Sequence, residues 1–451
     1  MSAAPGSRAP GAHAGAYLMR GAGVAALGGL LFGFDTAVIS GATRALTAVF
    51  SLSPAMLGVT VSSAVWGAVL GSLFAGGPAD RYGRPACLRA VGALYVASAC
   101  GCAVAWSWPA LVFFRVIGGV AIGASSVIGP MYIAEISPAA KRGRLVGMFQ
   151  FNIVLGILLA YLSNFLVARA GLGPDEWRWK FGVAALPAAA FFLALFGIPQ
   201  SPRWLVNAGR REEARGVLAR LGQADVEGEL RDIEATAGAD KGLGGAALLR
   251  RRFRKPVFLA ISIGMFNQLA GINAILYYLN DIFEQAGFSA MSSGAQAVAI
   301  GFTNLVFTMI AMSVIDRLGR KKLLLTGAVG TGLCLTGVAA IFAIGRHQQW
   351  LLYLLVAYIA FFAFSQGAVI WVYLSEVFPN RVRARGQSLG SFTHWIMNAG
   401  ISAVFPVVAK SSGAAPFFFF AFMMVVQFFV VLTVYPETSG VSLEEMERRL
   451  T

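Results

Sequence analysis

The sequence DRYGR at residues 80–84 decides the fold, because it recurs as DRLGR at residues 316–320 in a chain that is otherwise mostly apolar. A second repeat follows at nearly the same distance, since Gly-Phe-Asp at 33–35 matches Gly-Ile-Asn at 271–273. The two offsets, 236 and 238 residues, predict two homologous halves. The second repeat differs at its last position, where an acid in the first half is replaced by an amide in the second.

The composition is typical of a membrane protein. Of the 451 residues, 57% are hydrophobic and only 13% are charged, whereas about a quarter of the residues in a soluble domain are charged. Twelve apolar stretches are long enough to cross roughly 30 Å of hydrocarbon as helices. They lie near residues 17–40, 54–78, 86–106, 108–132, 144–168, 180–198, 257–280, 292–315, 322–345, 350–374, 387–409 and 415–435.

These stretches predict an all-α membrane protein with twelve transmembrane helices in two pseudo-symmetric six-helix bundles. Bundles related by an axis along the membrane normal carry their substrate site near the midplane, between the halves. The predicted segments are a disordered tail (1–16), an N-terminal bundle (17–198), a cytoplasmic linker with short amphipathic helices (199–256), a C-terminal bundle (257–435) and a cytoplasmic tail helix (436–451).

The net charge of +15 follows this topology and does not indicate a nucleic-acid partner. Of the 36 Lys and Arg residues, 29 lie on the side shared by the two tails and the central segment. By the positive-inside rule that side is cytoplasmic, so both termini are expected in the cytoplasm. The four cysteines have no metal-ligand spacing, and we expect neither a metal nor a cofactor.

Several motifs together resemble the sugar porter family of the major facilitator superfamily. They are GFDTAVISG at 33–41, RVIGG at 115–119, PMYIAE at 130–135, SPRWL at 201–205, NQLAGINAILYY at 267–278, WVYLSEVFPN at 371–380 and PETSG at 436–440. The resemblance covers almost the whole chain after the tail, and it is strongest to the bacterial xylose and glucose proton symporters. It implies a transporter, not an enzyme, that acts as a monomer in the cell membrane.

Repeated acidic and basic residues predict a gate at the cytoplasmic ends of the helices, because carboxylates and guanidinium groups form strong charge-assisted bonds. The candidate gate residues are Asp80, Arg81, Arg84, Glu135 and Arg142 in the first half and Asp316, Arg317, Arg320, Glu376 and Arg383 in the second. A simpler reading is that the basic residues only set the topology. Two departures from the family pattern are Pro85, in place of a basic residue, and Gln200, in place of Glu.

Asp35 is the candidate proton site. It lies within the first apolar stretch, where an ionised side chain costs about 2.5–3.5 kcal/mol unless it is paired or neutral. Arg115 is the basic residue in the middle of the fourth stretch, and the resemblance places it beside Asp35. A carboxyl group whose surroundings change during transport can bind a proton in one state and release it in the other. The alternative is a permanent ion pair that orients the two helices.

Amides and aromatic rings in the second half predict a sugar site, because amides both donate and accept hydrogen bonds and rings cover the apolar faces of a sugar. The resemblance assigns substrate binding to Gln150, Ile157, Asn267, Gln268, Asn273, Tyr278, Asn304, Trp371, His394, Trp395 and Phe32, with Phe32 and Tyr278 as lids. A break near Gly271 is expected to aim the helix-seven amides at one cavity. The alternative role of such amides is to bridge helices, which we expect of Asn164 and Asn398.

The departures at three of these positions bear on the substrate. Ile157 stands where the xylose symporters have a second Gln, Asn267 replaces a Gln, and His394 aligns with another sugar-contacting Gln. Ile157 favours D-glucose or another hexose over D-xylose. The acid at position 35 favours proton symport over a proton-independent uniporter of the same fold. A sugar sensor or a multidrug exporter fits less well, because the tail is short and the predicted cavity is polar.

Overall fold

The computed structural model describes residues 11–223, 225–237, 251–378, 382–441 and 443–450, which form helices joined by short connections. The long helices of the first half are α1 (Gly11–Val38), α3 (Pro54–Phe74), α5 (Arg84–Ala103), α6 (Trp108–Ile136), α7 (Ala139–Arg169) and the consecutive α8 (Glu176–Val183) and α9 (Ala185–Ala194). Shorter elements between them are η1 (Ile39–Gly41), α2 (Thr43–Phe50) and α4 (Gly76–Tyr82).

The second half repeats this order after the linker helices α10 (Pro202–Asn207), α11 (Arg211–Arg220) and α12 (Val226–Ala237). Its helices are α13 (Arg254–Leu269), α14 (Ile272–Tyr277), α15 (Leu279–Gln285), α16 (Ala290–Leu318), α17 (Arg320–Ile344), α18 (Leu351–Phe364), α19 (Gln366–Glu376), α20 (Arg383–Ser411) and α21 (Ala415–Val434). The chain then forms α22 (Leu443–Leu450).

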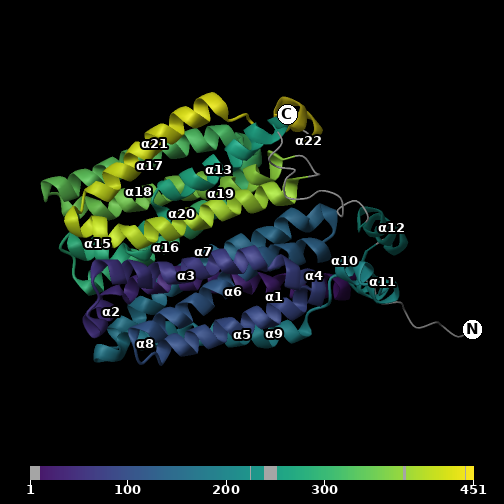
Figure 1. Cartoon of the computed structure of the whole chain (residues 1–451), viewed down its shortest axis with the longest axis horizontal. Coiled ribbons are helices and arrows are strands. Elements are labelled where there is room, and N and C mark those ends of the chain that lie inside the picture. Colours follow the sequence, from purple (N-terminus) through teal and green to yellow (C-terminus); the bar gives the residue numbers. More distant parts are fainter. Residues whose placement is uncertain (1–10, 224, 238–250, 379–381, 442, 451) are drawn as a thin grey trace, which may run out of the picture.

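The two halves lie side by side as separate bundles (Figure 1). Within the first, α1 packs on α7 and α3 packs on α6; within the second, α17 packs on α21 and α13 on α20. The halves meet where α3 contacts α20 and where α7 contacts α16. The linker helices and α22 lie at one end, here called the linker end, and α2, α8 and α15 lie at the other, the α15 end.

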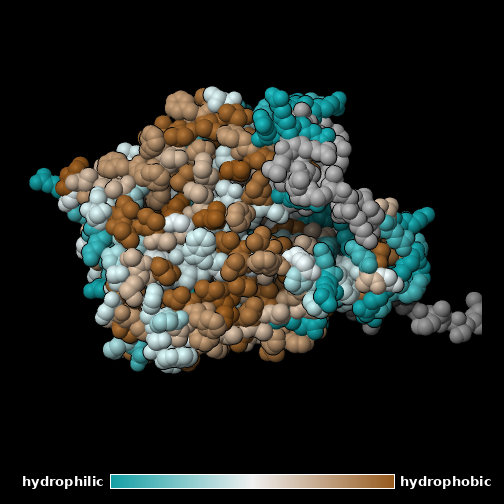
Figure 2. Space-filling view, in the orientation of Figure 1, coloured by the Kyte–Doolittle hydropathy of each residue, from teal (hydrophilic) through white to brown (hydrophobic). Residues whose placement is uncertain are grey.

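Large hydrophobic side chains cover the flank of the molecule, and hydrophilic ones gather at the linker helices and α22 (Figure 2). Side chains such as Leu73, Phe74, Leu186, Leu333 and Phe422 are each at least 60% exposed. So much exposed apolar surface is not tolerated in water. Twelve stretches of the described chain are long and apolar enough to span a bilayer, so the prediction of twelve membrane helices is confirmed.

The helix limits differ from the predicted ones at several points. The first helix begins at Gly11, ahead of the apolar stretch predicted from residue 17, and Ala14 lies against Gly222, which follows α11. The seventh membrane helix, formed by α13 and α14, is interrupted after Leu269, as expected from Gly271. The sixth membrane helix (α8 and α9) and the tenth (α18 and α19) are also divided, the tenth at Ser365. Ser442 is a candidate N-cap of the last helix, because Glu445 follows three positions later, but it lies outside the described residues.

Candidate functional site

Asp35 and Arg115 face each other between α1 and α6. Arg115 Nη1 lies 3.3 Å from Asp35 Oδ1 and 3.5 Å from Oδ2, which is longer than the 2.7–2.9 Å of a tight ion pair. The Arg115 side chain is 3% exposed and the Asp35 side chain 22%. The guanidinium group also stands over the Phe181 ring, 5.7 Å from its centre. The structure thus brings the two predicted residues together in a loose pair.

The position of Asp35 is set by the close packing of α1 on α7. A Cβ atom on Gly33 would lie 1.8 Å from the carbonyl oxygen of Ile153, so only glycine allows the two backbones to come this close. Because Asp35 is two residues further along α1, its side chain is directed toward α6. The glycine of the Gly-Phe-Asp repeat therefore has a packing role beside the acid.

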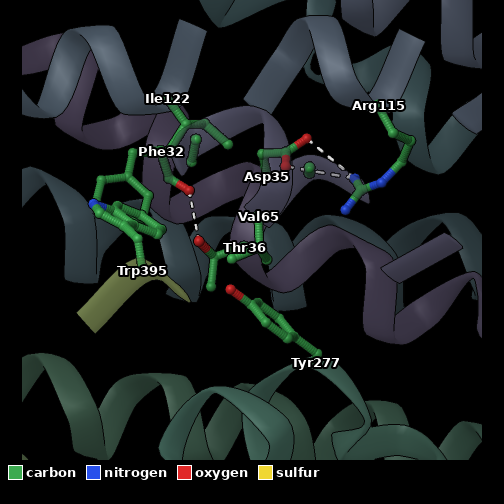
Figure 3. A pocket seen from close by; sticks show the side chains of 10 residues that line it. Phe32, Asp35, Thr36, Val65, Arg115, Ile122, Tyr277 and Trp395 are labelled. Carbon is green, nitrogen blue, oxygen red and sulfur yellow. Dashed lines mark hydrogen bonds and ion pairs between the residues drawn. The ribbon is translucent and has the colours of Figure 1, made fainter. Parts of the chain in front are cut away.

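A narrow cavity between the two halves reaches the Asp35 carboxyl group (Figure 3). Its free volume of about 10 Å³ corresponds to about one water molecule. The first half lines it with residues of α1, α3 and α6, and the second half with one residue each of α14 and α20: Phe32, Asp35, Thr36, Ala64, Val65, Ala68, Arg115, Ile122, Tyr277 and Trp395. The carboxyl group thus lies where both halves meet.

A second small cavity lies on the other side of Asp35, inside the first bundle. It is lined by Leu31, Asp35, Val38, Tyr95, Ser98, Ala99, Cys102, Phe181, Ala184 and Ala188. Besides Asp35, this wall has two residues with hydroxyl groups, Tyr95 and Ser98. The Tyr95 hydroxyl shares a hydrogen bond of 3.0 Å with Ser125, and the Ser98 hydroxyl donates to Phe114 O. Asp35 therefore borders two spaces, one between the halves and one within the first half.

The helix-seven amides form one hydrogen-bonded group around the break at Gly271. Gly271 has a φ of +85°, a conformation that other residues adopt only at a cost. Gln268 Nε2 donates to Asn267 Oδ1 over 2.9 Å, and Asn273 Nδ2 donates to Gln268 Oε1 over 3.0 Å. The break thus lets amides of α13 and α14 meet.

Aromatic residues of the second half extend this group toward the first half. Gln268 Nε2 lies 3.2 Å from His394 Nδ1, and the His394 ring lies 5.3 Å from Trp371 and 5.4 Å from Trp395 between ring centres. Trp395 in turn lies 5.5 Å from Phe32 on α1. An amide group with a wall of aromatic rings is suited to a neutral polar ligand with apolar faces.

The remaining predicted sugar residues lie on α7 and α16. Gln150 and Ile157 are on α7, and the backbone of Ile157 packs against Gly33. Asn304 is buried on α16, where its Oδ1 accepts a hydrogen bond from Thr308 over 3.4 Å. The two amides expected to bridge helices do so, since Asn164 Nδ2 donates to Val38 O and Asn398 Nδ2 donates to the Tyr277 hydroxyl.

Tyr278, predicted as a lid, is not among the residues that line the cavity. Its hydroxyl donates to Ser402 O over 2.9 Å, and its ring is stacked on Phe405 with 5.1 Å between centres. The neighbouring Tyr277 lines the cavity and points toward Thr36 (Figure 3). Tyr277 and not Tyr278 therefore faces this cavity, since adjacent residues on a helix point about 100° apart and the break at Gly271 sets that direction. The role of Tyr278 as a lid stays a prediction.

In the described part of the chain, the two DRxGR motifs form ion pairs within their own halves. Arg84 Nη2 lies 2.9 Å from Glu135 Oε1, and Arg320 Nη2 lies 2.8 Å from Glu376 Oε1. Arg84 and Arg320 also pair with Asp80 and Asp316, four residues earlier in each case. Both copies therefore tie the start of one helix to the end of another at the linker end.

The other gate candidates make different contacts. Arg142 Nε donates to the Ala134 carbonyl over 3.2 Å, so it does not take the place opposite Glu135 that Arg84 occupies. Arg81 stands over the Tyr82 ring, and Arg317 is exposed. The side chain of Arg383 lies outside the described part of the chain.

The substituted position Gln200 has a charged counterpart in the second half. Glu437 accepts hydrogen bonds from the backbone N–H groups of Arg320 and Lys321 at 2.9 and 3.0 Å, at the start of α17. Gln200 lies against Gly83 at the start of α5, and its Oε1 accepts from the N–H group of Ser201 over 3.1 Å. The first half thus has a neutral side chain where the second half has a carboxylate at a helix start, the position at which negative charge is stabilising.

At the α15 end, hydrogen bonds join the two halves directly. Thr43 Oγ1 donates to Asp281 Oδ1 over 3.0 Å, and Arg44 Nη1 lies 3.0 Å from Glu284 Oε2. Deeper between the bundles, the Tyr161 hydroxyl donates to Leu276 O over 2.8 Å. The bundles are therefore linked at the α15 end in this conformation.

Known proteins resemble this chain over nearly its full length. The family model described as "Sugar (and other) transporter" matches residues 22–450. The chain is 37% identical to a glucose transport protein of Synechocystis sp., covering 94% of this chain and 96% of that protein. It is 34% identical to the D-xylose-proton symporter of Escherichia coli, covering 94% of each.

Solved structures match as well. The inward open conformation of the xylose transporter XylE from E. coli has a TM-score of 0.86 at 32% identity and covers 96% of this chain and all of that chain. The same symporter bound to 6-bromo-6-deoxy-D-glucose has a TM-score of 0.81 and covers 97% of this chain and 99% of that one.

Proposed function

The chain belongs to the sugar transporter family of the major facilitator superfamily, and from this premise we propose that it is a proton-coupled monosaccharide symporter. It is a multi-pass membrane protein and not an enzyme. The proposed substrate is D-glucose or another hexose, with D-xylose as the main competitor. The proposed cycle exposes one central site alternately to the two sides of the membrane.

The observation that carries the proton coupling is the loose Asp35–Arg115 pair at the wall of the cavity between the halves. A carboxyl group held by a single guanidinium nitrogen at 3.3–3.5 Å can exchange that partner for a proton at a small cost. Because the cavity wall consists of residues from both halves, any rocking of the halves changes the surroundings of Asp35. Proton binding and rocking are therefore coupled.

The amide group around Gly271 and the rings of Trp371, His394 and Trp395 support the sugar assignment. In this conformation Gln268 and Asn273 bond to each other, so a sugar must replace these bonds with its own hydroxyl groups. The exchange is close to neutral in energy for each bond, and affinity then comes from covering the ring faces. Relatives named as a glucose transport protein, a D-xylose-proton symporter and an arabinose-proton symporter all favour a monosaccharide.

We place the linker end on the cytoplasmic side, because the basic residues concentrate there. Both termini would then be cytoplasmic. The links between the halves at the α15 end correspond to a state that is closed toward the outside. Opening to the outside must break the Thr43–Asp281, Arg44–Glu284 and Tyr161–Leu276 contacts.

Transport by proteoliposomes tests the proposal. Across a membrane potential of 100 mV, one coupled proton contributes about 2.3 kcal/mol, which corresponds to about 50-fold accumulation of sugar. We expect Asp35→Asn to abolish this accumulation and to retain counterflow exchange of labelled D-glucose. The control is Asp175→Asn, an identical change in an exposed residue at the α15 end, which is expected to accumulate sugar normally.

Proton-driven accumulation by the Asp35→Asn protein would refute the coupling role of Asp35. If the unaltered protein exchanges sugar but shows no accumulation in a proton gradient, the uniporter is the correct function. If neither D-glucose nor D-xylose is exchanged, the monosaccharide assignment is wrong.

A further inference from the structure

Asp281 is a partly buried acid at the α15 end, about ten residues after the amide group and outside the membrane-spanning segments. Its Oδ1 is bonded to Thr43 across the boundary between the halves. Its Oδ2 is buried and has no hydrogen-bond partner among the described residues. An ionised carboxylate with one unsolvated oxygen is costly, whereas a protonated group avoids most of that cost.

We propose that Asp281 is a second proton-binding residue, which takes up a proton when the α15 end closes and releases it to the same side when that end opens. The contact that closes over Asp281 comes from the other half, so it exists only while the bundles are together at this end. Opening would expose the carboxyl group to water. Proton binding at Asp281 therefore favours the outward-closed state.

The hydrogen-bond geometry supports a protonated Asp281. The Thr43 hydroxyl lies 3.0 Å from Asp281 Oδ1 and 3.3 Å from Ser40 O. One hydroxyl has a single hydrogen and cannot donate to both oxygens. A protonated Asp281 can donate to Thr43 Oγ1, which leaves the Thr43 hydrogen for Ser40 O, so both acceptors are satisfied.

The repeat explains why these two residues meet. Thr43 and Asp281 are 238 residues apart, the same offset that relates the Gly-Phe-Asp and Gly-Ile-Asn repeats. Equivalent positions of two related halves come into contact where they approach the symmetry axis between them. Both lie just beyond the ends of equivalent helices, so this pair senses the separation of the halves.

The charged neighbours of Asp281 have opposing effects. The pKa of Asp281 is raised to about 7. Burial, the largest cause, raises it, the hydrogen bond from Thr43 lowers it, the negative charge of Glu284 raises it and the positive charge of Arg44 lowers it. Arg44 and Glu284 pair with each other, and the Arg44 side chain is 76% exposed. Burial thus outweighs the two charged neighbours.

The other elements packed on α15 contribute few charges. Near η1, Lys180 donates to Gly41 O and pairs with Glu176 on α8. On α16 the first charged residue is Asp316, near its opposite end, and α14 provides phenol groups at Tyr277 and next to it at Tyr278. Within the described part of the chain, Arg44 is the one basic side chain among the charged groups that act on Asp281.

The sign of the pH effect follows from these values. Asp281 has a pKa of about 7 when the α15 end is closed and about 3.9 when it is open to water. The preference for the closed state is complete below about pH 4 and is lost as the pH rises through 7. Between pH 5 and 8 the ratio of closed to open molecules should fall by up to about a hundredfold, since each pH unit below the higher pKa is worth about tenfold.

The experiment that tests this proposal measures the distance between α2 and α15 and not sugar transport. Spin labels on Ala48→Cys in α2 and Gln285→Cys in α15, both exposed, would report the separation of the halves after the four native cysteines are replaced by serine. We expect the population with the short distance to shrink from pH 5 to pH 8 in the otherwise unaltered protein. Asp281→Asn should stay short at every pH, and the control Asp175→Asn should respond like the unaltered protein.

The inference would be overturned by a distance that does not depend on pH in the otherwise unaltered protein, or by an Asp281→Asn protein with the same pH response. It rests on the proposed alternating access but not on the role of Asp35. The accumulation ratio separates the role of Asp281 from that of Asp35, because a proton that is released to the side from which it was bound adds nothing to net transport. Asp281→Asn should therefore accumulate sugar to the same ratio, and a lower ratio would show that Asp281 carries a transported proton.

Discussion

The break in helix seven provides a measurable test of how the sugar group is positioned. In Gly271→Ala, the alanine must adopt a φ near +85°, which costs about 1–2 kcal/mol. Its Cβ atom would also lie 2.4 Å from Phe420 Cδ2, and Phe420 is only 3% exposed. Because that ring cannot move into open space, overpacking adds about 1–3 kcal/mol. We expect a total loss of stability of about 2–5 kcal/mol.

Gly345→Ala is the matched control. Gly345 also has a positive φ, +69°, but a Cβ atom there would meet nothing within 4 Å. The loss of stability in Gly345→Ala should therefore be confined to about 1–2 kcal/mol of backbone strain. Unfolding of both variants in a denaturing detergent titration gives the two losses, and their difference isolates the contact with Phe420. If Gly345→Ala is destabilised as much as Gly271→Ala, the packing argument fails.

The same substitution should weaken sugar binding, because Asn267 and Gln268 precede the break and Asn273 follows it. A shift of the break moves the two sets of amides relative to each other. Gly271→Ala should raise the half-saturating sugar concentration in counterflow, and Gly345→Ala should not. Unchanged sugar affinity in a destabilised Gly271→Ala protein would show that the break stabilises the fold but does not position the amides for sugar binding.

The remaining predictions concern individual residues of the site. Replacing His394 with Gln should change the ratio of D-glucose to D-xylose uptake by about 2- to 10-fold, which is the value of one hydrogen bond. The reason is that His394 contacts both Gln268 and the two tryptophans. An unchanged ratio in competition uptake would show that His394 is not part of the sugar site. Tyr277→Phe should raise the half-saturating sugar concentration, because Tyr277 lines the cavity, whereas Tyr278→Phe should affect stability and leave sugar affinity unchanged; the reverse order in counterflow would restore Tyr278 as the lid.

The fold could be predicted from local features of the sequence. Twelve apolar stretches and two copies of the DRxGR cassette are each visible within a few residues of chain, and the structure contains the corresponding helices. The break at Gly271 was also visible, because a glycine between amides and tyrosines is a local signal. The contact of Ala14 with Gly222 is not a local signal, because it depends on the linker lying against the first helix.

The partners of the charged residues could not be read from spacing. Glu135 and Arg142 are close in sequence, yet Glu135 pairs with Arg84, 51 residues earlier, because α5 and α6 pack side by side. The choice between Tyr277 and Tyr278 depended on the direction of α14 after the break. The bond between Thr43 and Asp281 joins residues 238 apart, and only the closing of the two halves brings them together.

The repeat now gives a reason for the different proposed fates of two protons. Asp35 and Asp281 are both acids whose counterpart in the other half is neutral, Asn273 and Thr43 respectively. Asp35 lies at the cavity between the halves, so rocking can expose it first to one side of the membrane and then to the other. Asp281 lies at the α15 end, where opening leads to one side only. On this proposal a proton on Asp35 can cross the membrane and drive accumulation, whereas a proton on Asp281 changes only the pH-dependent ratio of closed to open molecules.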